Sequence, residues 1–174
     1  MDERRDSRAE PTATSAEIRW VGVISDTHGL LRPEVFEAFR GVSHILHAGD
    51  VGDPMILEDL AALAPVTAVW GNMDGPDIQA VTQEEAAVEL AQTPIAVIHG
   101  HQLGDYGRLP ARFPAARVIV HGHTHLPFND RIDGTLVLNP GSAGPRRSGK
   151  PVTVALLRLD SDGARARHVH LQDS

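Results

Sequence analysis

The sequence predicts an α/β (α+β) fold in which two mixed β-sheets pack as a sandwich flanked by helices. Two observations support this class. Strand and helix patterns alternate over residues 18–72, and short β-rich segments separated by Gly, Pro and Asp turns follow from residue 86 onward. An alternating half followed by an antiparallel half indicates two sheets in a single domain, which we expect to span residues 17–174.

The alternating half has clear helix boundaries. The first helix has Pro33 in its first turn and Gly41 at its end, and Pro65 closes the second helix. The apolar runs between these helices predict buried strands of a mostly parallel sheet. The expected strands cover residues 18–24, 44–48 and 66–72, and the expected helices cover residues 33–41 and 54–64.

The second half is predicted to be β-rich. Beyond Asp74 the helical periodicity disappears, so no further helix is expected. Asp133-Gly134 and Asp162-Gly163 are hairpin signals between flanking strands. The expected strands cover residues 86–90, 94–99, 117–121, 135–139, 152–159 and 165–171.

Composition narrows the function classes. The chain has Lys+Arg 16 against Asp+Glu 23, a formal net charge of -7, so we expect no nucleic-acid-binding surface. The absence of Cys excludes disulfides, thiolate zinc sites and a Cys nucleophile, and it fits a reducing compartment, which we expect to be the cytoplasm. No apolar run approaches the roughly 18 residues of a membrane span, so no membrane association is expected.

Residues 1–16 are polar and mixed in charge. We expect a disordered tail, because this segment cannot bury enough apolar area to offset its ordering entropy. Arg4 and Arg5 suggest a twin-arginine export signal, but no apolar segment of roughly 7 to 15 residues follows them, so we reject that interpretation.

A polar cluster follows each of five expected strands. The carboxyl ends of strands open onto the crevice where α/β sheets bind ligands, so these clusters are candidates for one site. Residues i and i+2 of an extended segment point the same way, roughly 6.6 Å apart, so the D-x-H and H-x-H pairs can converge. Carboxylate, amide and imidazole groups favour Mn, Fe, Zn or Ni, and they outnumber the four ligands of one zinc-like ion. The clusters are Asp26-Thr27-His28, Gly49-Asp50, Gly71-Asn72-Met73-Asp74, His99-Gly100-His101 and His121-Gly122-His123-Thr124-His125.

The order DTH, GD, GNMD, HGH and GHTH resembles the five-block signature of the calcineurin-like metallophosphoesterases. NPGS at residues 139–142 is similar to their small prokaryotic phosphodiesterase branch. The resemblance extends from about residue 18 onward and implies the four-layer αββα metallophosphoesterase fold. It implies that one metal is held by Asp26, His28, Asp50 and His125, and a second by Asp50, Asn72, His99 and His123. Asp50 would be the shared ligand.

The resemblance also implies an activity, the hydrolysis of small phosphodiesters by a water activated between two divalent metal ions. Mn²⁺ is the expected ion, with Ni²⁺, Co²⁺, Fe and Zn²⁺ as alternatives. Asp50 and Asn72 would be catalytic as well as ligands, and Asn72 would contact the substrate. Arg147, in the loop of residues 144–150, is a further candidate for substrate contact, with a solvated position as the alternative. Two divalent ions and two carboxylates leave a charge of about +2, which attracts a phosphate. The oligomeric state stays open, a homo-oligomer included.

One position departs from the protein phosphatases of this superfamily, which carry His after the Asn of the third block as the acid for the leaving group. Here the residue is Met73, whose thioether cannot donate a proton, and His101 is our candidate for that role. The alternative function is a noncatalytic interaction scaffold, as in the retromer subunit that resembles this family. Loss of a ligand would favour the scaffold, and none is missing. A serine hydrolase that used Ser142 or Ser25 is not expected, because neither serine lies in a G-x-S-x-G motif.

Other polar residues have structural interpretations. Residues 144–150 match the spacing of a phosphate-binding loop, but Pro151 and β-branched residues follow in place of a helix, so we expect no nucleotide there. His47 is interpreted as a structural residue; the alternative is that it orients a neighbouring metal ligand. The remaining expectations are that Asp74 accepts hydrogen bonds beside the ligands, that His121 packs inside, and that His44, His168 and His170 lie on strand surfaces.

Overall fold

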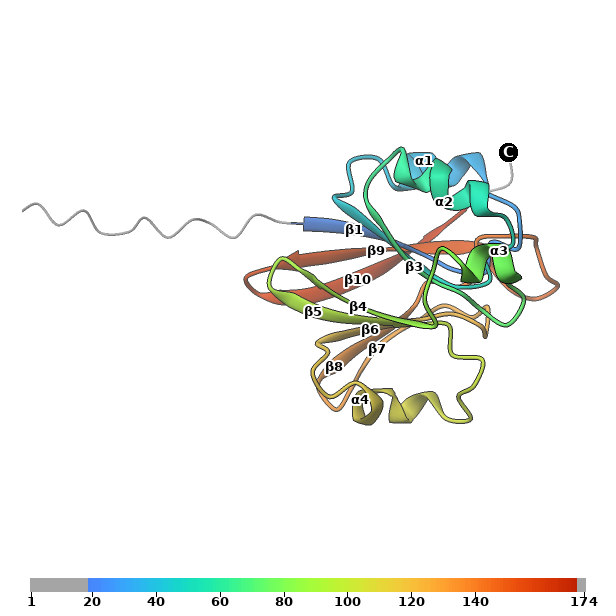
Figure 1. The fold of residues 1–174 in the computed structure, drawn as a ribbon. Helices are drawn as coiled ribbons and strands as arrows, with labels where there is room; N and C mark the ends of the chain where they lie inside the picture. The colour runs from blue at the N-terminus through green and yellow to red at the C-terminus, as the bar shows by residue number, and fades with distance from the viewer. Residues whose placement is uncertain (1–18, 172–174) are drawn as a thin grey trace, which may run out of the picture.

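The computed structural model describes residues 19–171 and shows two five-stranded sheets stacked face to face, with helices on the outer faces (Figure 1). This architecture confirms the predicted fold class. The tail expected at residues 1–16, with Arg4 and Arg5, lies outside the described residues. None of the helices between residues 19 and 171 combines the length and the apolar character of a membrane span.

The first sheet has the strand order β10-β9-β1-β2-β3. Its strands are β1 (Arg19–Ile24), β2 (His44–Ala48), β3 (Val66–Val69), β9 (Thr153–Asp160) and β10 (Gly163–His170). β1, β2 and β3 are parallel, as predicted, and β9 pairs antiparallel with both β1 and β10. The carboxyl ends of the three parallel strands therefore meet at one edge.

The second sheet has the order β4-β5-β6-β8-β7. Its strands are β4 (Glu85–Leu90), β5 (Thr93–Ile98), β6 (Val118–His121), β7 (Phe128–Ile132) and β8 (Thr135–Asn139). β5, β6 and β8 are parallel, with antiparallel β4 and β7 at the edges. The expectation of an antiparallel second half is therefore wrong for its three central strands, because strand patterns in the sequence do not reveal strand direction. Only the Asp133-Gly134 hairpin signal indicated β7, because its residues are mostly polar and exposed.

Helices α1 (Pro33–Ala38) and α2 (Pro54–Ala61) occur where predicted, although both end earlier. The expectation of no helix beyond Asp74 is wrong. α3 (Pro76–Gln79), the 3₁₀ turn η1 (Tyr106–Arg108) and α4 (Leu109–Arg112) follow it. Each has at most four residues, about one turn, so no apolar periodicity can reveal it.

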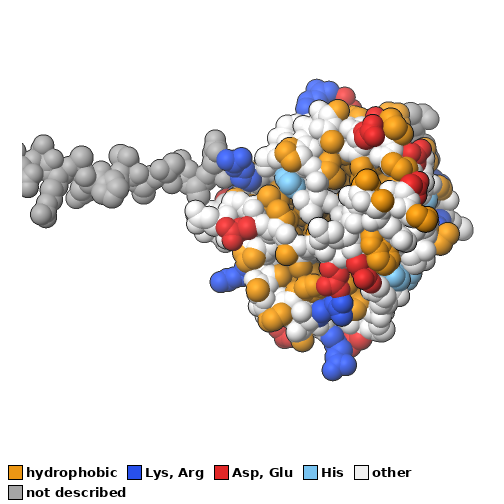
Figure 2. Space-filling view, in the orientation of Figure 1, with side chains coloured by type: hydrophobic (Ala, Val, Ile, Leu, Met, Phe, Trp, Pro, Cys, Tyr) orange, Lys and Arg blue, Asp and Glu red, His pale blue; other side chains and the backbone are white. Residues whose placement is uncertain are grey.

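Apolar side chains fill the space between the sheets, including fully buried Val23, Leu46, Val120 and Leu138. A second apolar cluster lies beneath α1 and α2. Gly22 is required there, because a Cβ at this position of β1 would lie 2.9 Å from the Phe39 ring. On the face shown in Figure 2, Lys and Arg side chains are scattered among acidic and apolar ones.

The two sheets are also connected along both sides. On one side, the Trp70 N–H, just after β3, donates to the Gln83 carbonyl, just before β4, at 2.9 Å. On the other, Asn129 of β7 donates to the Ala166 carbonyl of β10 at 2.7 Å. Between these connections, β2 contacts β5 and β6 across the interface, and β3 contacts β5.

Candidate metal centre

The residues that follow β1, β2, β5 and β6 gather at one end of the sandwich. Five of the predicted ligands have positive φ angles, a region that residues with side chains rarely adopt. They are Asp26 (55°), His28 (48°), Asp50 (53°), His123 (69°) and His125 (58°). Backbone strain of this kind concentrates at functional sites, where the surrounding structure maintains it.

Asp26 presents one carboxylate oxygen to the protein and the other to the site. Its Oδ2 accepts hydrogen bonds from the Ser25 hydroxyl at 2.6 Å and the His123 backbone N–H at 3.2 Å. Its Oδ1 lies 3.1 Å from His125 Nε2 and 3.9 Å from His28 Nε2, and it accepts no hydrogen bond. Oδ1 is therefore the atom that can bind a cation.

Asp50 is oriented in the same way. Its Oδ1 accepts the Met73 N–H at 2.8 Å. Its Oδ2 lies 3.3 Å from His99 Nε2 and 3.9 Å from His28 Nε2, so it faces histidines from both halves of the predicted ligand set. This position suits a carboxylate shared by two cations.

His99 has its tautomer set by the opposite sheet. Its Nδ1 donates to the Ala48 carbonyl of β2 at 2.7 Å, which leaves Nε2 without a hydrogen and available as a ligand. His28 and His125 stack with ring centroids 5.1 Å apart, and their Nε2 atoms are 3.3 Å apart. Two imidazoles held with their Nε2 atoms together match a common cation.

The remaining predicted site residues lie around this centre. The His123 ring lies 5.3 Å from that of His99, and the His101 ring lies 5.6 Å from it. Asn72 is exposed just beyond β3, at the rim. Arg147 lines a small cleft with His125. The exposed Met73 side chain contributes nothing polar, and its backbone N–H holds Asp50.

The two carboxylates are charged at neutral pH. Burial alone would raise the pKa of Asp26, but His125, His99 and Ser25 outweigh burial and hold this pKa below its usual value. At Asp50, burial is likewise outweighed by His99 and the Met73 N–H, so the pKa is lowered. Deprotonated carboxylates are the form that binds cations.

The imidazoles divide into two groups. Burial lowers the pKa values of His28 and His123, which keeps them neutral at pH 7. At His99, burial is outweighed by Asp50, Asp26 and the Ala48 carbonyl, so its pKa is raised. A proton and a cation therefore compete for His99 Nε2.

The donor atoms fit divalent cations. Asp26 Oδ1 and His99 Nε2 are buried without a hydrogen bond, an arrangement that is costly unless another group satisfies them. Ligand atoms of Asp26, His28 and His125 lie within 4.8 Å of one another, as do those of Asp26, Asp50 and His99. Oxygen and imidazole donors without sulfur suit Mn, Fe, Co, Ni or Zn.

Close backbone approaches shape the centre. A Cβ on Gly122 would lie 2.0 Å from Ser25 Oγ and 2.9 Å from Asp26 Oδ2. A Cβ on Gly71 would lie 2.2 Å from Asp50 Oδ1. Glycine at both positions is therefore a condition for the carboxylate orientations.

On the first-sheet side, buried polar residues support the ligand loops. His47 Nε2 lies 3.0 Å from Thr27 Oγ1, which donates to the Val51 carbonyl, and His47 Nδ1 accepts the Gly49 N–H at 3.2 Å. His47 therefore supports the loop that precedes Asp50. Asp74 accepts the N–H groups of Gly52 and Gly71 at 2.9 and 2.8 Å, which confirms its predicted role.

On the second-sheet side, Asn139 supports the loop that carries His123 and His125. Its buried Nδ2 donates to the Gly122 carbonyl at 2.9 Å and to Thr124 Oγ1 at 3.0 Å. Sequence reasoning missed this role, although a polar residue ending an apolar strand was a usable signal.

Further histidines can now be placed. His121 is buried and stacks on Tyr106 at 4.6 Å, which confirms that it packs inside. The interpretation of His168 as strand surface is wrong, because it is half-buried and donates to the Asn139 carbonyl at 2.7 Å. The same expectation is wrong for His44, which is also half-buried and lies 2.8 Å from Thr67 Oγ1, whereas His170 is exposed as predicted.

Residues 144–150 do not form a phosphate-binding loop. No helix follows them, because β9 begins at Thr153. Lys150 Nζ donates to the Thr124 carbonyl at 2.7 Å. Its ammonium therefore supports the loop between His123 and His125.

Known proteins resemble this chain over most of its length. A probable metallophosphoesterase from Methanothermobacter thermautotrophicus is 41% identical over 153 residues, covering 82% of this chain and 87% of that protein. The phosphodiesterase YfcE of Escherichia coli is 32% identical over 162 residues, covering 78% and 85%. The structure of vacuolar protein sorting 29 from Cryptosporidium parvum superposes with a TM-score of 0.73 at 22% identity, covering 90% of this chain and 99% of that chain, which shows a shared fold.

The family profile of the calcineurin-like phosphoesterase superfamily domain matches residues 20–162. This segment contains all five motifs and all the candidate ligands. The chain therefore belongs to the calcineurin-like phosphoesterase superfamily.

Proposed function

We propose that this protein is a metal-dependent phosphoesterase that hydrolyses small phosphodiesters at the centre around Asp26 and Asp50. The observation that best supports the proposal is the pair of buried atoms without hydrogen bonds, Asp26 Oδ1 and His99 Nε2, among neutral imidazoles. Such a centre attracts cations, and through them an anionic phosphate. The relative named phosphodiesterase supports the substrate class.

Two cations are proposed for the site. The first would be held by Asp26, His28, Asp50 and His125, and the second by Asp50, Asn72, His99 and His123. We expect Mn²⁺, with Ni²⁺, Co²⁺, Fe and Zn²⁺ as alternatives, because imidazoles outnumber carboxylates.

When bound, the cations supply Lewis-acid stabilisation of the phosphoryl oxygens and activate water for attack on phosphorus. The chain supplies position and protons. Asn72 and Arg147 donate N–H groups to the phosphate and hold it at the centre. His101 gives a proton to the leaving oxygen; because burial lowers its pKa, the imidazolium that donates is a minor form at pH 7 and its contribution grows as the pH falls.

A noncatalytic scaffold is the alternative, since a vacuolar sorting protein shares the fold. Two observations favour the hydrolase. Both carboxylates are present, and each has one oxygen held by the protein and the other turned to the site. A scaffold requires neither this orientation nor the strained φ angles.

The test is hydrolysis of bis(p-nitrophenyl) phosphate, with bound metal measured by elemental analysis. We expect a chelator to abolish the activity, and Mn²⁺, Ni²⁺ or Co²⁺ to restore it better than Mg²⁺. A reconstituted, folded protein that binds no transition metal, or that binds it without hydrolysing the diester, would contradict the proposal.

A further inference from the structure

Two aromatic side chains meet at the rim of the metal centre. Trp70, just beyond β3 of the first sheet, and His101, just beyond β5 of the second, have ring centroids 5.8 Å apart at 40°. Both are partly exposed. The His101 ring also lies 5.6 Å from that of His99 and 6.4 Å from that of His123. The Trp70–His101 surface therefore adjoins the proposed second-cation ligands.

Trp70 is held firmly in this place. Its backbone N–H donates to the Gln83 carbonyl at 2.9 Å, in the bridge between the two sheets. Its ring packs against the apolar cluster that includes Ile78 and Leu60. A ring held in this way loses little conformational entropy when a ligand stacks on it.

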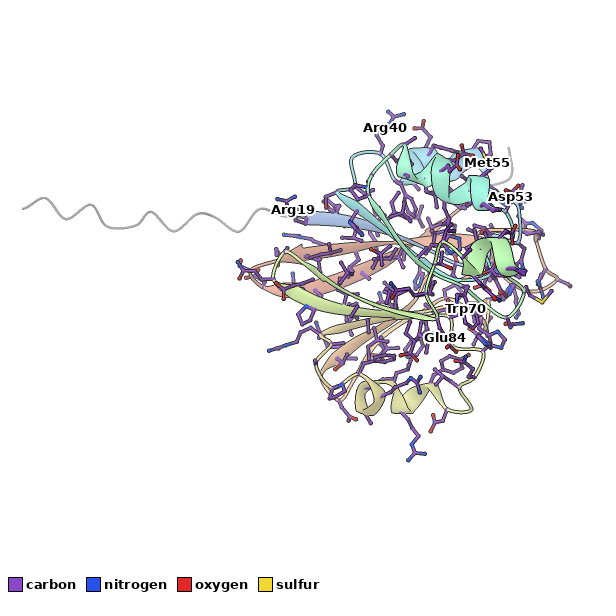
Figure 3. The ribbon with its side chains drawn as sticks, in the orientation of Figure 1. Arg19, Arg40, Asp53, Met55, Trp70 and Glu84 are labelled. Atoms are coloured by element: carbon purple, nitrogen blue, oxygen red, sulfur yellow. The ribbon has the colours of Figure 1, made fainter. Side chains whose placement is uncertain are left out.

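Polar groups that can form hydrogen bonds with an aromatic heterocycle lie beside the Trp70–His101 surface. Gln102, next to His101, donates from Nε2 to the carboxylate of Glu84, close to the Gln83 bridge. Both side chains are exposed, and Figure 3 shows Glu84 close to Trp70. An amide and a carboxylate offer the donors and acceptors that match the edge of a nucleobase.

The opposite side of the centre differs in chemistry. Arg147 and Lys150 line the cleft beside His125, where the first cation is proposed. A phosphate held at the centre thus has cationic groups on one side and the Trp70–His101 surface on the other. A planar group attached to the phosphate gains stacking only on the Trp70 side.

We propose that Trp70 binds the base of a nucleoside phosphodiester by stacking, while the phosphate occupies the metal centre and His101, beside Trp70, serves the leaving oxygen. This specificity rests on the proposed phosphodiesterase function. Alanine substitution data put base stacking on an aromatic side chain at about 1–3 kcal/mol, which corresponds to about 5- to 150-fold in affinity. We expect a selectivity near the lower end, because Trp70 is only partly exposed.

Binding can be measured without catalysis. The chain has two Trp residues, and Trp20 lies at the start of β1, while Asp26 follows the other end of that strand. Figure 3 shows Arg19, the neighbour of Trp20, far from Trp70. In a Trp20→Phe variant, Trp70 is therefore the single indole fluorophore. Thymidine 5′-monophosphate should quench its fluorescence saturably, with an affinity about tenfold above that of ribose 5-phosphate under the same cation concentration. Equal responses to the two phosphates would overturn the proposal.

Kinetics provide the second test. Thymidine 5′-p-nitrophenyl phosphate and ethyl p-nitrophenyl phosphate share a leaving group and differ only in the group that stays on phosphorus. The wild type should prefer the nucleoside ester about tenfold in kcat/KM, and Trp70→Leu should remove that preference mainly through KM. Trp20→Phe should retain it.

The outcomes separate the two proposals. Equal losses on both esters in a Trp70→Leu protein of wild-type circular dichroism would show a structural role and overturn the nucleoside proposal. Should Trp70→Leu not fold, the Trp70 fluorescence titration in Trp20→Phe decides. If the metal-loaded wild type hydrolyses neither ester, the phosphodiesterase function fails, while the titration still tests the base-binding surface.

Discussion

The two sheets contribute different chemistry to one centre. The first sheet supplies both carboxylates, Asp26 after β1 and Asp50 after β2, and the second supplies His99, His123 and His125. Each sheet also orients the other's ligands. The Ala48 carbonyl of the first sheet fixes the His99 tautomer, and the His123 backbone N–H of the second holds Asp26. The centre is therefore a property of the interface, and neither sheet contains it alone.

The largest expected effect comes from the first-sheet carboxylate that faces both sides. Asp50→Asn removes the shared negative charge, so we expect loss of both cations and activity near background. Elemental analysis and diester hydrolysis measure this. His170→Ala, an exposed position on β10, is the matched control and should retain metal and activity. Similar losses in the two variants would refute the assignment.

Removing a ligand of the second sheet should lower the metal content less than Asp50→Asn does. His123→Ala removes one imidazole from the second proposed cation only, so the protein should retain about one equivalent of metal. Activity should fall by about two orders of magnitude, because a two-metal centre then acts with one ion. Loss of both ions would show that the ligands are not divided between the two cations as proposed.

His101, which follows β5 of the second sheet, is the proposed proton donor to the leaving group. With ethyl aryl phosphates of graded leaving-group acidity, His101→Ala should leave p-nitrophenyl ester hydrolysis almost unchanged and slow the phenyl ester about 10²-fold, since only a poor leaving group requires an acid. A series of esters run on both proteins measures the slope. An unchanged slope would remove His101 from the catalytic residues.

One buried histidine in each sheet, His47 and His121, should make the folded protein less stable in acid. Burial lowers the pKa of His47 and of His121 to about 4. Their pKa in the unfolded chain is about 6.5, so the unfolded state binds more protons between these values. The stability they contribute is present above pH ~6.5 and is lost as the pH falls toward 4, by up to about 3 kcal/mol each.

Urea denaturation of metal-free protein at pH 7.5 and 5 measures this loss. His47→Gln keeps a donor toward Thr27 and cannot be protonated, so the difference in free energy of unfolding between the two pH values should shrink. His121→Gln should do the same in the second sheet. An unchanged difference in both variants would show that other groups cause the acid sensitivity.

The smallest expected effect concerns support of the second-sheet loop. Asn139→Ala removes the donors to the Gly122 carbonyl and Thr124 Oγ1, so the loop with His123 and His125 should hold metal about tenfold less tightly. Titration with Mn²⁺ measures the affinity. Ser25→Ala, which removes a hydrogen bond from Asp26 in the first sheet, provides the comparison. A loss confined to Ser25→Ala would place the support in the first sheet alone.

Local patterns were sufficient for most of the fold. Apolar runs, Pro33 and Gly41 predicted the parallel strands and α1, because period and turn chemistry are local properties. The apolar pattern did not predict β7 and α3, because a polar edge strand and a single helical turn have no detectable hydrophobic periodicity. The prediction for His168 failed because its partner, the Asn139 carbonyl, is remote in sequence.

By itself, the sequence determined which residue types end which strands, and hence the family and the set of candidate ligands. Only the tertiary structure decided which oxygen of Asp26 is held and which is available, that Asn139 supports the histidine loop, and that Trp70 meets His101. The reason is physical. A motif consists of residues close together in the sequence, whereas these contacts join segments that are remote in the sequence. Their geometry exists only after the apolar faces of the sheets have packed together.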